Sequence, residues 1–185
     1  MKKLSIVLIF LVSLTNLSLA HEIKYDGFIM PESVAEGPDG NIYVSEMGEK
    51  DKDGDGKISK IDKKGNITPF AIGLYDPKGI VFYKDKLYVT DRDVIIEVDT
   101  DGTWSVFGST MAFPKTPVFL NDIDVDSDGN FYITDTSNFE TGGIVFKMNL
   151  AGDITVLFDE TTKNNKAPNG VLPIKNNKLL LLDWG

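Results

Sequence analysis

The sequence predicts an all-β protein built from a repeated unit, and three observations lead to this prediction. Short runs of branched and aromatic residues, each introduced by a turn dipeptide, recur roughly every 45 residues. After each of the first three runs comes a longer stretch that alternates apolar and polar residues, turns at a glycine and alternates again, as a hairpin does. No window has helical periodicity of comparable strength.

The repeated elements fall into two families of predicted strands. The first comprises NIYVSE at 41–46, KLYVTD at 86–91, NFYITD at 130–135 and KLLLLD at 178–183. The second comprises the hairpins KISKIDKKGNITPF, VIIEVDTDGTWSVF and IVFKMNLAGDITVLF, which turn at Gly65, Gly102 and Gly152. Four short strands in a repeat of this length are typical of a β-propeller blade. The alternative is a β-sandwich with coincidental spacing, which does not explain why both families recur in the same order.

Three full repeats are followed by part of a fourth, which ends in LLLLDWG. Closed propellers have about four to eight complete blades, and an unpaired apolar strand at the end of a sheet would leave an adhesive edge. We therefore expect residues 21–185 to form a partial β-propeller domain of about four blades, and to be a piece of a longer propeller.

Residues 1–20 have the layout of a cleaved secretory signal peptide. Lys2 and Lys3 precede an apolar run, which ends in the small-residue sequence Ser18-Leu19-Ala20. The run is short for a membrane span, so a retained anchor is the weaker interpretation and no span is expected after cleavage. The sequence thus predicts an exported protein, periplasmic or secreted.

Composition narrows the possible partners and chemistry. The formal net charge is −9 at pH 7, and no basic stripe is present, so nucleic acid is not an expected partner. The chain has no cysteine, which excludes disulfides and thiol chemistry. Its single histidine, His21, lies outside the repeats, which argues against a nucleophile–histidine pair. A monomer is expected.

The repeat also aligns one residue at the start of each predicted innermost strand. These residues are Glu32 in PESVAEGP, Lys78 in DPKGIVF, Asn121 in FLNDIDV and Asn169 in APNGVLP. In a propeller such positions meet at one mouth of the central channel, and carboxylate and amide oxygens are ligands that calcium and magnesium prefer. The alternatives are that the asparagines bond backbone groups in turns, and that Glu32 is solvated or paired with Lys78.

Three stretches carry a family resemblance: PESVAEGPDGNIYVSE, FLNDIDVDSDGNFYITD, and APNGV followed by LLLLD. Together they resemble the gluconolactonase, senescence marker protein and regucalcin family of six-bladed propellers. The resemblance implies a divalent metal held by Glu32 and Asn169, with Asn121 as a further ligand or a substrate-facing residue. Calcium is the expected metal, with magnesium or zinc as alternatives. The implied substrate is a lactone, such as a sugar lactone, or a related small ester.

The sequence departs from that family in two ways. The family's third protein ligand, an aspartate that also serves as the catalytic base, comes from a later blade, so the base is expected beyond Gly185 and no catalytic residue is assigned. Lys78 places a cation beside the expected metal, where it would pair with Glu32 or, together with Asn121, bind the substrate.

A second aligned set closes the first strand family. It consists of Glu46, Asp91, Asp135 and Asp183. Two interpretations are open: these carboxylates accept hydrogen bonds in the next turn, or they orient the metal ligands. The turn interpretation is favoured.

The stretch DKDGDGKISKID has the spacing of a calcium-binding EF-hand loop, with Asp51, Asp53, Asp55, Lys57 and Asp62 at its ligand positions. Neither flank is helical, however, and Asp62 has equivalents in the other repeats. We expect a hairpin loop, and leave open whether it binds calcium in a stabilising role.

Two functions of different classes fit these observations. The first is an exported metal-dependent hydrolase resembling gluconolactonase, which would act on a lactone or small ester at the channel mouth. The alternative is a non-catalytic extracytoplasmic propeller that binds a ligand or a protein partner there, because propellers serve many roles.

Overall fold

A computed structural model describes residues 23–50, 52–162 and 165–185. The described chain forms three four-stranded antiparallel sheets and one two-stranded sheet, each with its strands in chain order. Its only helical element is a 3-10 turn at Thr110–Ala112. The predicted all-β class and partial β-propeller are confirmed.

Each sheet is one blade, numbered from its innermost strand outward. The first blade contains β1 (Pro31–Glu36), β2 (Ile42–Glu46), β3 (Gly56–Ile61) and β4 (Ile67–Leu74). The second contains β5 (Pro77–Tyr83), β6 (Lys86–Asp91), β7 (Val94–Val98) and β8 (Trp104–Gly108). The third contains β9 (Leu120–Val125), β10 (Phe131–Asp135), β11 (Ile144–Met148) and β12 (Ile154–Phe158), and the fourth β13 (Pro168–Ile174) and β14 (Lys178–Asp183).

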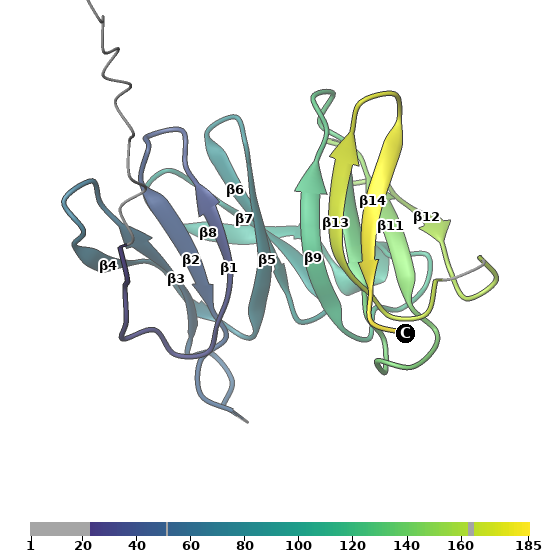
Figure 1. The fold of residues 1–185 in the computed structure, drawn as a ribbon, viewed down its shortest axis with the longest axis horizontal. Helices are drawn as coiled ribbons and strands as arrows, with labels where there is room; N and C mark the ends of the chain where they lie inside the picture. The colour runs from purple at the N-terminus through teal and green to yellow at the C-terminus, as the bar shows by residue number, and fades with distance from the viewer. Residues whose placement is uncertain (1–22, 51, 163–164) are drawn as a thin grey trace, which may run out of the picture.

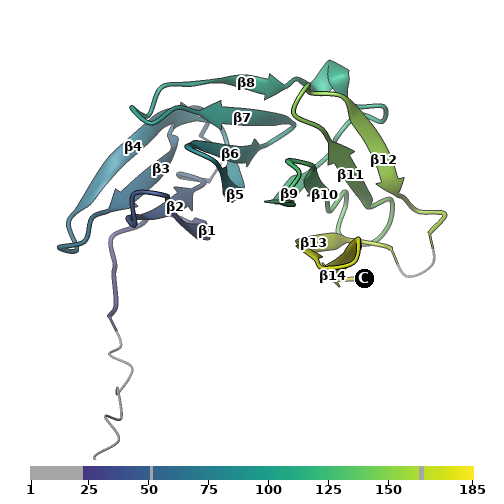
Figure 2. The same ribbon diagram turned by 90° about the horizontal axis from the view of Figure 1, so that it is seen from above.

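The blades lie side by side (Figure 1) and together form part of a ring (Figure 2). Seen from above, β1, β5, β9 and β13 follow one another along the concave side, while β4, β8 and β12 lie on the outside (Figure 2). The innermost strands of neighbouring blades are in contact, β1 with β5, β5 with β9 and β9 with β13. The start of every innermost strand therefore faces a common space.

Apolar side chains between neighbouring blades hold the arc together. One core lies between the first two blades and includes the fully buried Ile58, Leu74 and Val89. The other lies between the second and third blades and is centred on Phe131 and Phe146. Each such side chain contributes roughly 1.5–3 kcal/mol through burial. Successive residues of β6 and β10 are buried on both faces of the strand, because each of these sheets packs against a neighbouring blade on either side.

Close approach of two innermost strands depends on Gly79. A Cβ atom added there would lie 2.6 Å from Asp122 Cα and 2.7 Å from Ile123 N, both backbone atoms that cannot rotate away. The glycine therefore lets β5 pack directly against β9.

No helix within the described ranges is long and apolar enough to cross a membrane. The leader predicted at 1–20 lies outside the described residues.

We expect Gly79→Ala to lower the free energy of unfolding by about 3 kcal/mol, because the new methyl group overlaps backbone that cannot yield. Gly108→Ala is the matched control, since its Cβ would lie 3.3 Å or more from side-chain atoms of Ile95 and Met148. Urea unfolding of both variants measures the difference. Equal losses would show that β5 and β9 are less tightly packed than described.

Candidate metal and substrate site at the channel mouth

The four residues aligned by the repeat occupy the same register position in their blades. In each blade the residue just before the aligned one pairs with the last residue of the second strand. The pairs are Pro31 with Glu46, Pro77 with Asp91, Leu120 with Asp135, and Pro168 with Asp183. Glu32, Lys78, Asn121 and Asn169 are thus equivalent in the fold and lie at the same end of their strands, on one face of the ring.

The acidic residue that ends each second strand anchors the segment leading into the innermost strand. Asp135, only 1% exposed, accepts hydrogen bonds from the backbone N–H groups of Val118 (2.7 Å) and Phe119 (2.9 Å). The other blades repeat this contact: Glu46 accepts from Ile29, Asp91 from Tyr75 and Asp76, and Asp183 from Lys166 and Ala167. The favoured interpretation placed these bonds in the next turn, and there Asp135 accepts from Ser137 N and Asp183 from Gly185 N. The contact common to all four blades is instead with the segment that enters the innermost strand.

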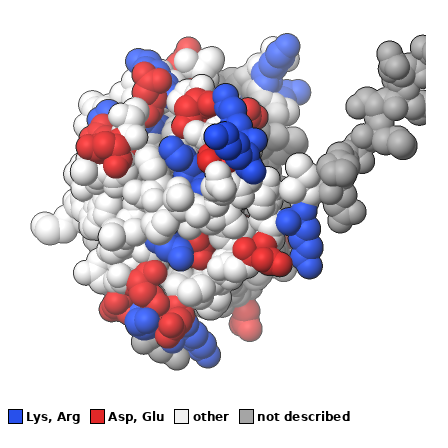
Figure 3. All heavy atoms as spheres, turned by 90° about the vertical axis from the view of Figure 1, so that its left-hand side faces the viewer, with Lys and Arg blue, Asp and Glu red and all other residues white. Residues whose placement is uncertain are grey.

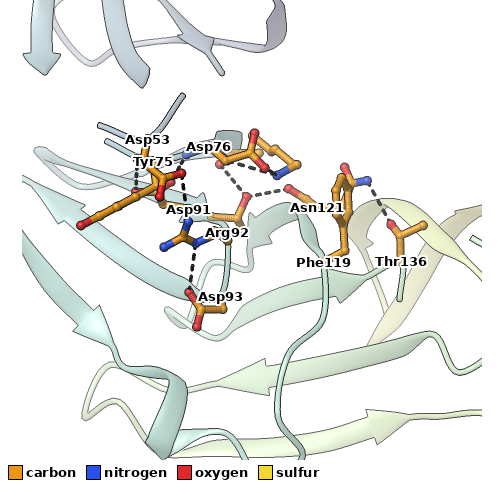
Figure 4. A network of polar contacts seen from close by, with 12 residues as sticks. Asp53, Tyr75, Asp76, Asp91, Arg92, Asp93, Phe119, Asn121 and Thr136 are labelled. Carbon is orange, nitrogen blue, oxygen red and sulfur yellow. Dashed lines mark hydrogen bonds and ion pairs between the residues drawn. The ribbon is translucent and has the colours of Figure 1, made fainter. Parts of the chain in front are cut away.

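Asn121 has an unusual environment for a buried amide. Its side chain is 4% exposed, and its Nδ2 donates to Thr136 Oγ1 at 3.0 Å, as Figure 4 shows. Its Oδ1 is buried, and none of the described residues donates a hydrogen bond to it. Because an unsatisfied buried acceptor costs about 1–3 kcal/mol, this oxygen is a site where a cation or a bound donor would be stabilised.

Lys78 is a buried cation beside this oxygen-rich region. Its side chain is 2% exposed; Nζ bonds the Asp76 carboxylate and the Asp76 carbonyl (3.2 Å) and lies 4.2 Å from the centre of the Phe119 ring. The direct ion-pair partner of Lys78 is thus Asp76, whereas Glu32 feels its charge without a contact. Because Asp76 balances the positive charge of Lys78, the attraction of Lys78 for a bound anion is reduced.

Carboxylates gather on the concave side near the mouth. Desolvation raises the pKa of Glu32 from 4.5 to about 7; Asp122 adds to the rise, Lys78 opposes it and Asp76 adds further. Glu32 does reach solvent, but the blades beside it remove part of its hydration. Burial also raises the pKa of Asp122 and of Asp124, against the lowering effect of backbone N–H donors. The region therefore disfavours further negative charge and favours a bound cation.

Asn169 is half-buried in β13, next to the strand that carries Asn121. Its carbonyl accepts a hydrogen bond from Thr134 Oγ1 at 2.6 Å, and the carbonyl of the preceding Pro168 accepts one from Thr136 Oγ1 at 2.8 Å. Thr136 therefore joins β13 to the amide of Asn121.

The donor set suits a hard cation of the calcium type. It consists of one carboxylate and two amides from Glu32, Asn121 and Asn169, all oxygen ligands. Within the described ranges no three His, Cys, Asp or Glu residues cluster closely enough to hold a metal. Amide oxygens are also hard ligands, and the buried Oδ1 of Asn121 is such an oxygen.

The acidic loop between β2 and β3 has other partners. Asp51 lies outside the described residues. Asp53 pairs with Arg92 (3.2 Å), as Figure 4 shows, and Asp55 accepts from Glu49 N (3.0 Å) and pairs with Lys52 (3.4 Å).

The other two residues of the EF-hand spacing, Lys57 and Asp62, have partners outside the loop. Lys57 lies 3.4 Å from Glu46, and Asp62 caps the turn at the opposite end of β3, where it accepts from Lys64 N and Asn66 N. The structure does not bring Asp62 together with Asp53 and Asp55. Figure 3 shows the face that lies on the left in Figure 1. On it, charged side chains of both signs gather toward the top and the bottom of the view, with a largely uncharged band between them.

Sequence reasoning missed Asp122 near the mouth and Asp124 further along the same strand. Their signal was present in LNDIDV, where acidic residues alternate with Ile123 and Val125, so that one face of the strand is acidic. It also missed the aromatic residues around Phe139, because no repeat pattern marks the loop that carries them.

No known protein family and no curated protein sequence matches this chain. Solved structures do match it. A protein assigned as a gluconolactonase by structural genomics is 17% identical, with a TM-score of 0.70 over 86% of this chain and 57% of its own. A gluconolactonase from Xanthomonas campestris is 14% identical, with a TM-score of 0.62 over the same shares. Regucalcin from Agrobacterium tumefaciens, a calcium-binding protein, is 18% identical, with a TM-score of 0.60 over 82% and 52%.

The chain thus spans about half the length of these structures. Identities this low show the fold alone. At that level the resemblance inferred from the sequence motifs is confirmed: the chain has the fold of the gluconolactonase and regucalcin propellers.

We expect Asp135→Asn to lower the free energy of unfolding by about 2 kcal/mol, because its amide nitrogen would face backbone donors that the carboxylate now satisfies. Asp126→Asn is the control, since Asp126 caps an exposed turn in which asparagine is also favourable. Chemical unfolding compares the two variants. A larger loss for Asp126→Asn would contradict the anchoring role.

The raised pKa of Glu32 predicts a dependence of stability on pH. Between about pH 4.5 and 7 the folded chain keeps a proton on Glu32 that the unfolded chain has lost. This contribution is complete below pH 4.5 and is lost as the pH rises through 7. The difference in stability between wild type and Glu32→Gln should therefore change across this window, with Glu36→Gln as the charge-matched control. If the difference in stability between wild type and Glu32→Gln stays constant from pH 4.5 to 7, the raised pKa of Glu32 is wrong.

Proposed function

We propose that this chain contributes the metal-holding mouth of an exported, metal-dependent hydrolase of the lactonase type. Glu32, Asn121 and Asn169 would hold a divalent cation, with calcium preferred. The observation that carries the proposal is the buried Asn121 Oδ1, which has no donor and lies at the same register position as Glu32 and Asn169.

The proposed chemistry is hydrolysis of a cyclic ester. A bound divalent cation supplies Lewis acidity, which polarises a carbonyl group and promotes attack by water. The chain's own residues set up that environment: Thr136 holds the Asn121 amide with its oxygen free, and Lys78 stays neutralised by Asp76. The surrounding carboxylates disfavour a negatively charged substrate, so a neutral lactone fits better than an acid.

Three further parts of the proposal have separate support. Calcium is supported by the description of the Agrobacterium tumefaciens regucalcin as a calcium-binding protein. A lactone substrate is supported by the two gluconolactonase structures that share the fold. Export is supported by the signal-like sequence of residues 1–20.

We expect titration calorimetry of the chain with calcium to show one site at the mouth. Glu32→Ala and Asn121→Ala should each weaken calcium binding at least about tenfold, because each removes an oxygen ligand from a small set. Asn169→Ala should do the same. The double variant Asp53→Asn, Asp55→Asn is the control and should keep this site.

Wild-type affinity in all three single variants would contradict the proposed mouth site. If calcium binding is lost only in the double variant Asp53→Asn, Asp55→Asn, the calcium site lies in the loop between β2 and β3. Calcium binding at the mouth without turnover of any lactone would favour the non-catalytic binding propeller.

A further inference from the structure

Three aromatic rings form a continuous row at the mouth. Phe119 precedes β9, Phe139 lies in the loop between β10 and β11, and Trp184 follows β14. The rings of Phe119 and Phe139 meet edge to face with centres 4.9 Å apart, and those of Phe139 and Trp184 are tilted by 31° with centres 5.7 Å apart. The row brings together parts of the third and fourth blades that are distant in sequence.

The row is exposed although it is made of large apolar groups. Phe139 is 41% and Trp184 67% exposed, whereas Phe119 is half-buried. Exposed aromatic clusters of this kind commonly mark a binding surface. The backbone holds them in place: Trp184 N donates to Ala167 O at 3.1 Å, and Phe139 N donates to Thr136 O at 3.2 Å.

Phe139 is held in a backbone conformation that a large side chain rarely adopts. Its φ is +70°, in the left-handed region that favours glycine. Ser137 and Gly142 in the same loop also have positive φ. Such conformations cost free energy and tend to occur at functional sites. The fold therefore places the Phe139 ring against the row at a cost that glycine would avoid.

The row is continuous with the polar site. At one end of the row, the ring of Phe119 lies over the ammonium of Lys78. Phe119 is also two residues before Asn121, and its backbone N–H donates to Asp135. Thr136 binds the Asn121 amide and begins the loop that carries Phe139. Through Phe119 and Thr136 the row adjoins Lys78 and Asn121, so a molecule lying over Phe139 and Trp184 would sit beside the proposed metal site.

We propose that this aromatic row selects substrates in which the lactone ring carries an aryl or other flat apolar group, in preference to polyhydroxylated sugar lactones. Phe119 and Phe139 have no polar atoms to exchange hydrogen bonds with sugar hydroxyl groups, and Trp184 offers only its single indole N–H donor. All three rings can stack against an apolar ring. This inference rests on the proposed function and names its substrate class. Phe139 and Trp184 are specificity-determining residues in this account.

Two lactams that resist hydrolysis test the row without requiring turnover. The probes are 3,4-dihydroquinolin-2-one, which carries a fused aryl ring, and 2-piperidone, which lacks it. Binding is followed by the fluorescence of Trp184 in the Trp104→Phe background, because these are the only two tryptophans. The aryl lactam should bind at least about tenfold more tightly than 2-piperidone.

Phe139→Gly is the main variant, because glycine accepts the positive φ and the loop should fold at least as well as in wild type. It should weaken binding of the aryl lactam at least about fivefold and leave 2-piperidone unchanged. Trp184→Phe should retain the preference and Trp184→Ala should reduce it, both measured by calorimetry. Met111→Ala, at a 95% exposed position in the 3-10 turn, is the control for a remote change.

Equal affinity for the two lactams in wild type, or an unchanged preference in both Phe139→Gly and Trp184→Ala, would overturn this inference. The outcome is separate from that of the proposed function. If the row prefers the aryl lactam but no lactone is hydrolysed, the inference about the row holds and the proposed hydrolase function is wrong. If a lactone is hydrolysed but the row shows no preference, the proposed function holds and the inference about the row is wrong.

Discussion

The structure depends on one recurring interaction, in which a carboxylate at the end of each second strand accepts hydrogen bonds from the segment entering the innermost strand. In the third blade Asp135 has this role, and Glu46, Asp91 and Asp183 repeat it. The contact fixes where each innermost strand begins. Since the aligned residue follows the anchored N–H groups by two or three positions, its location is fixed as well. A site made from different blades can be well formed only because every blade sets this point in the same way.

The same interaction underlies the cation site proposed at the mouth. The anchoring carboxylates use their oxygens on backbone donors, and Lys78 is neutralised by Asp76. Glu32 and Asp122 are left on the concave side with raised pKa values, beside an amide oxygen of Asn121 that has no donor. A divalent cation would satisfy the oxygen and relieve the repulsion between the carboxylates together.

Much of the fold could be predicted from the sequence because repeats report blade structure directly. The strand families and the equivalence of Glu32 with Asn169 follow from pattern and spacing. The partners of individual charges could not be predicted, because they depend on how each loop folds locally and on which loops of neighbouring blades meet. Lys78 bonds Asp76, which lies in the segment held by Asp91, and Asp53 reaches Arg92 across the blade boundary. The aromatic row is equally invisible in sequence, since its members meet only through tertiary packing.

The most direct test of the central claim is an anomalous diffraction measurement on crystals of the chain grown with terbium, a calcium substitute. The account predicts one strong anomalous peak at the channel mouth, within bonding distance of oxygens from Glu32, Asn121 and Asn169. A peak only at the loop between β2 and β3, or no ordered peak at the mouth at saturating terbium, would contradict it.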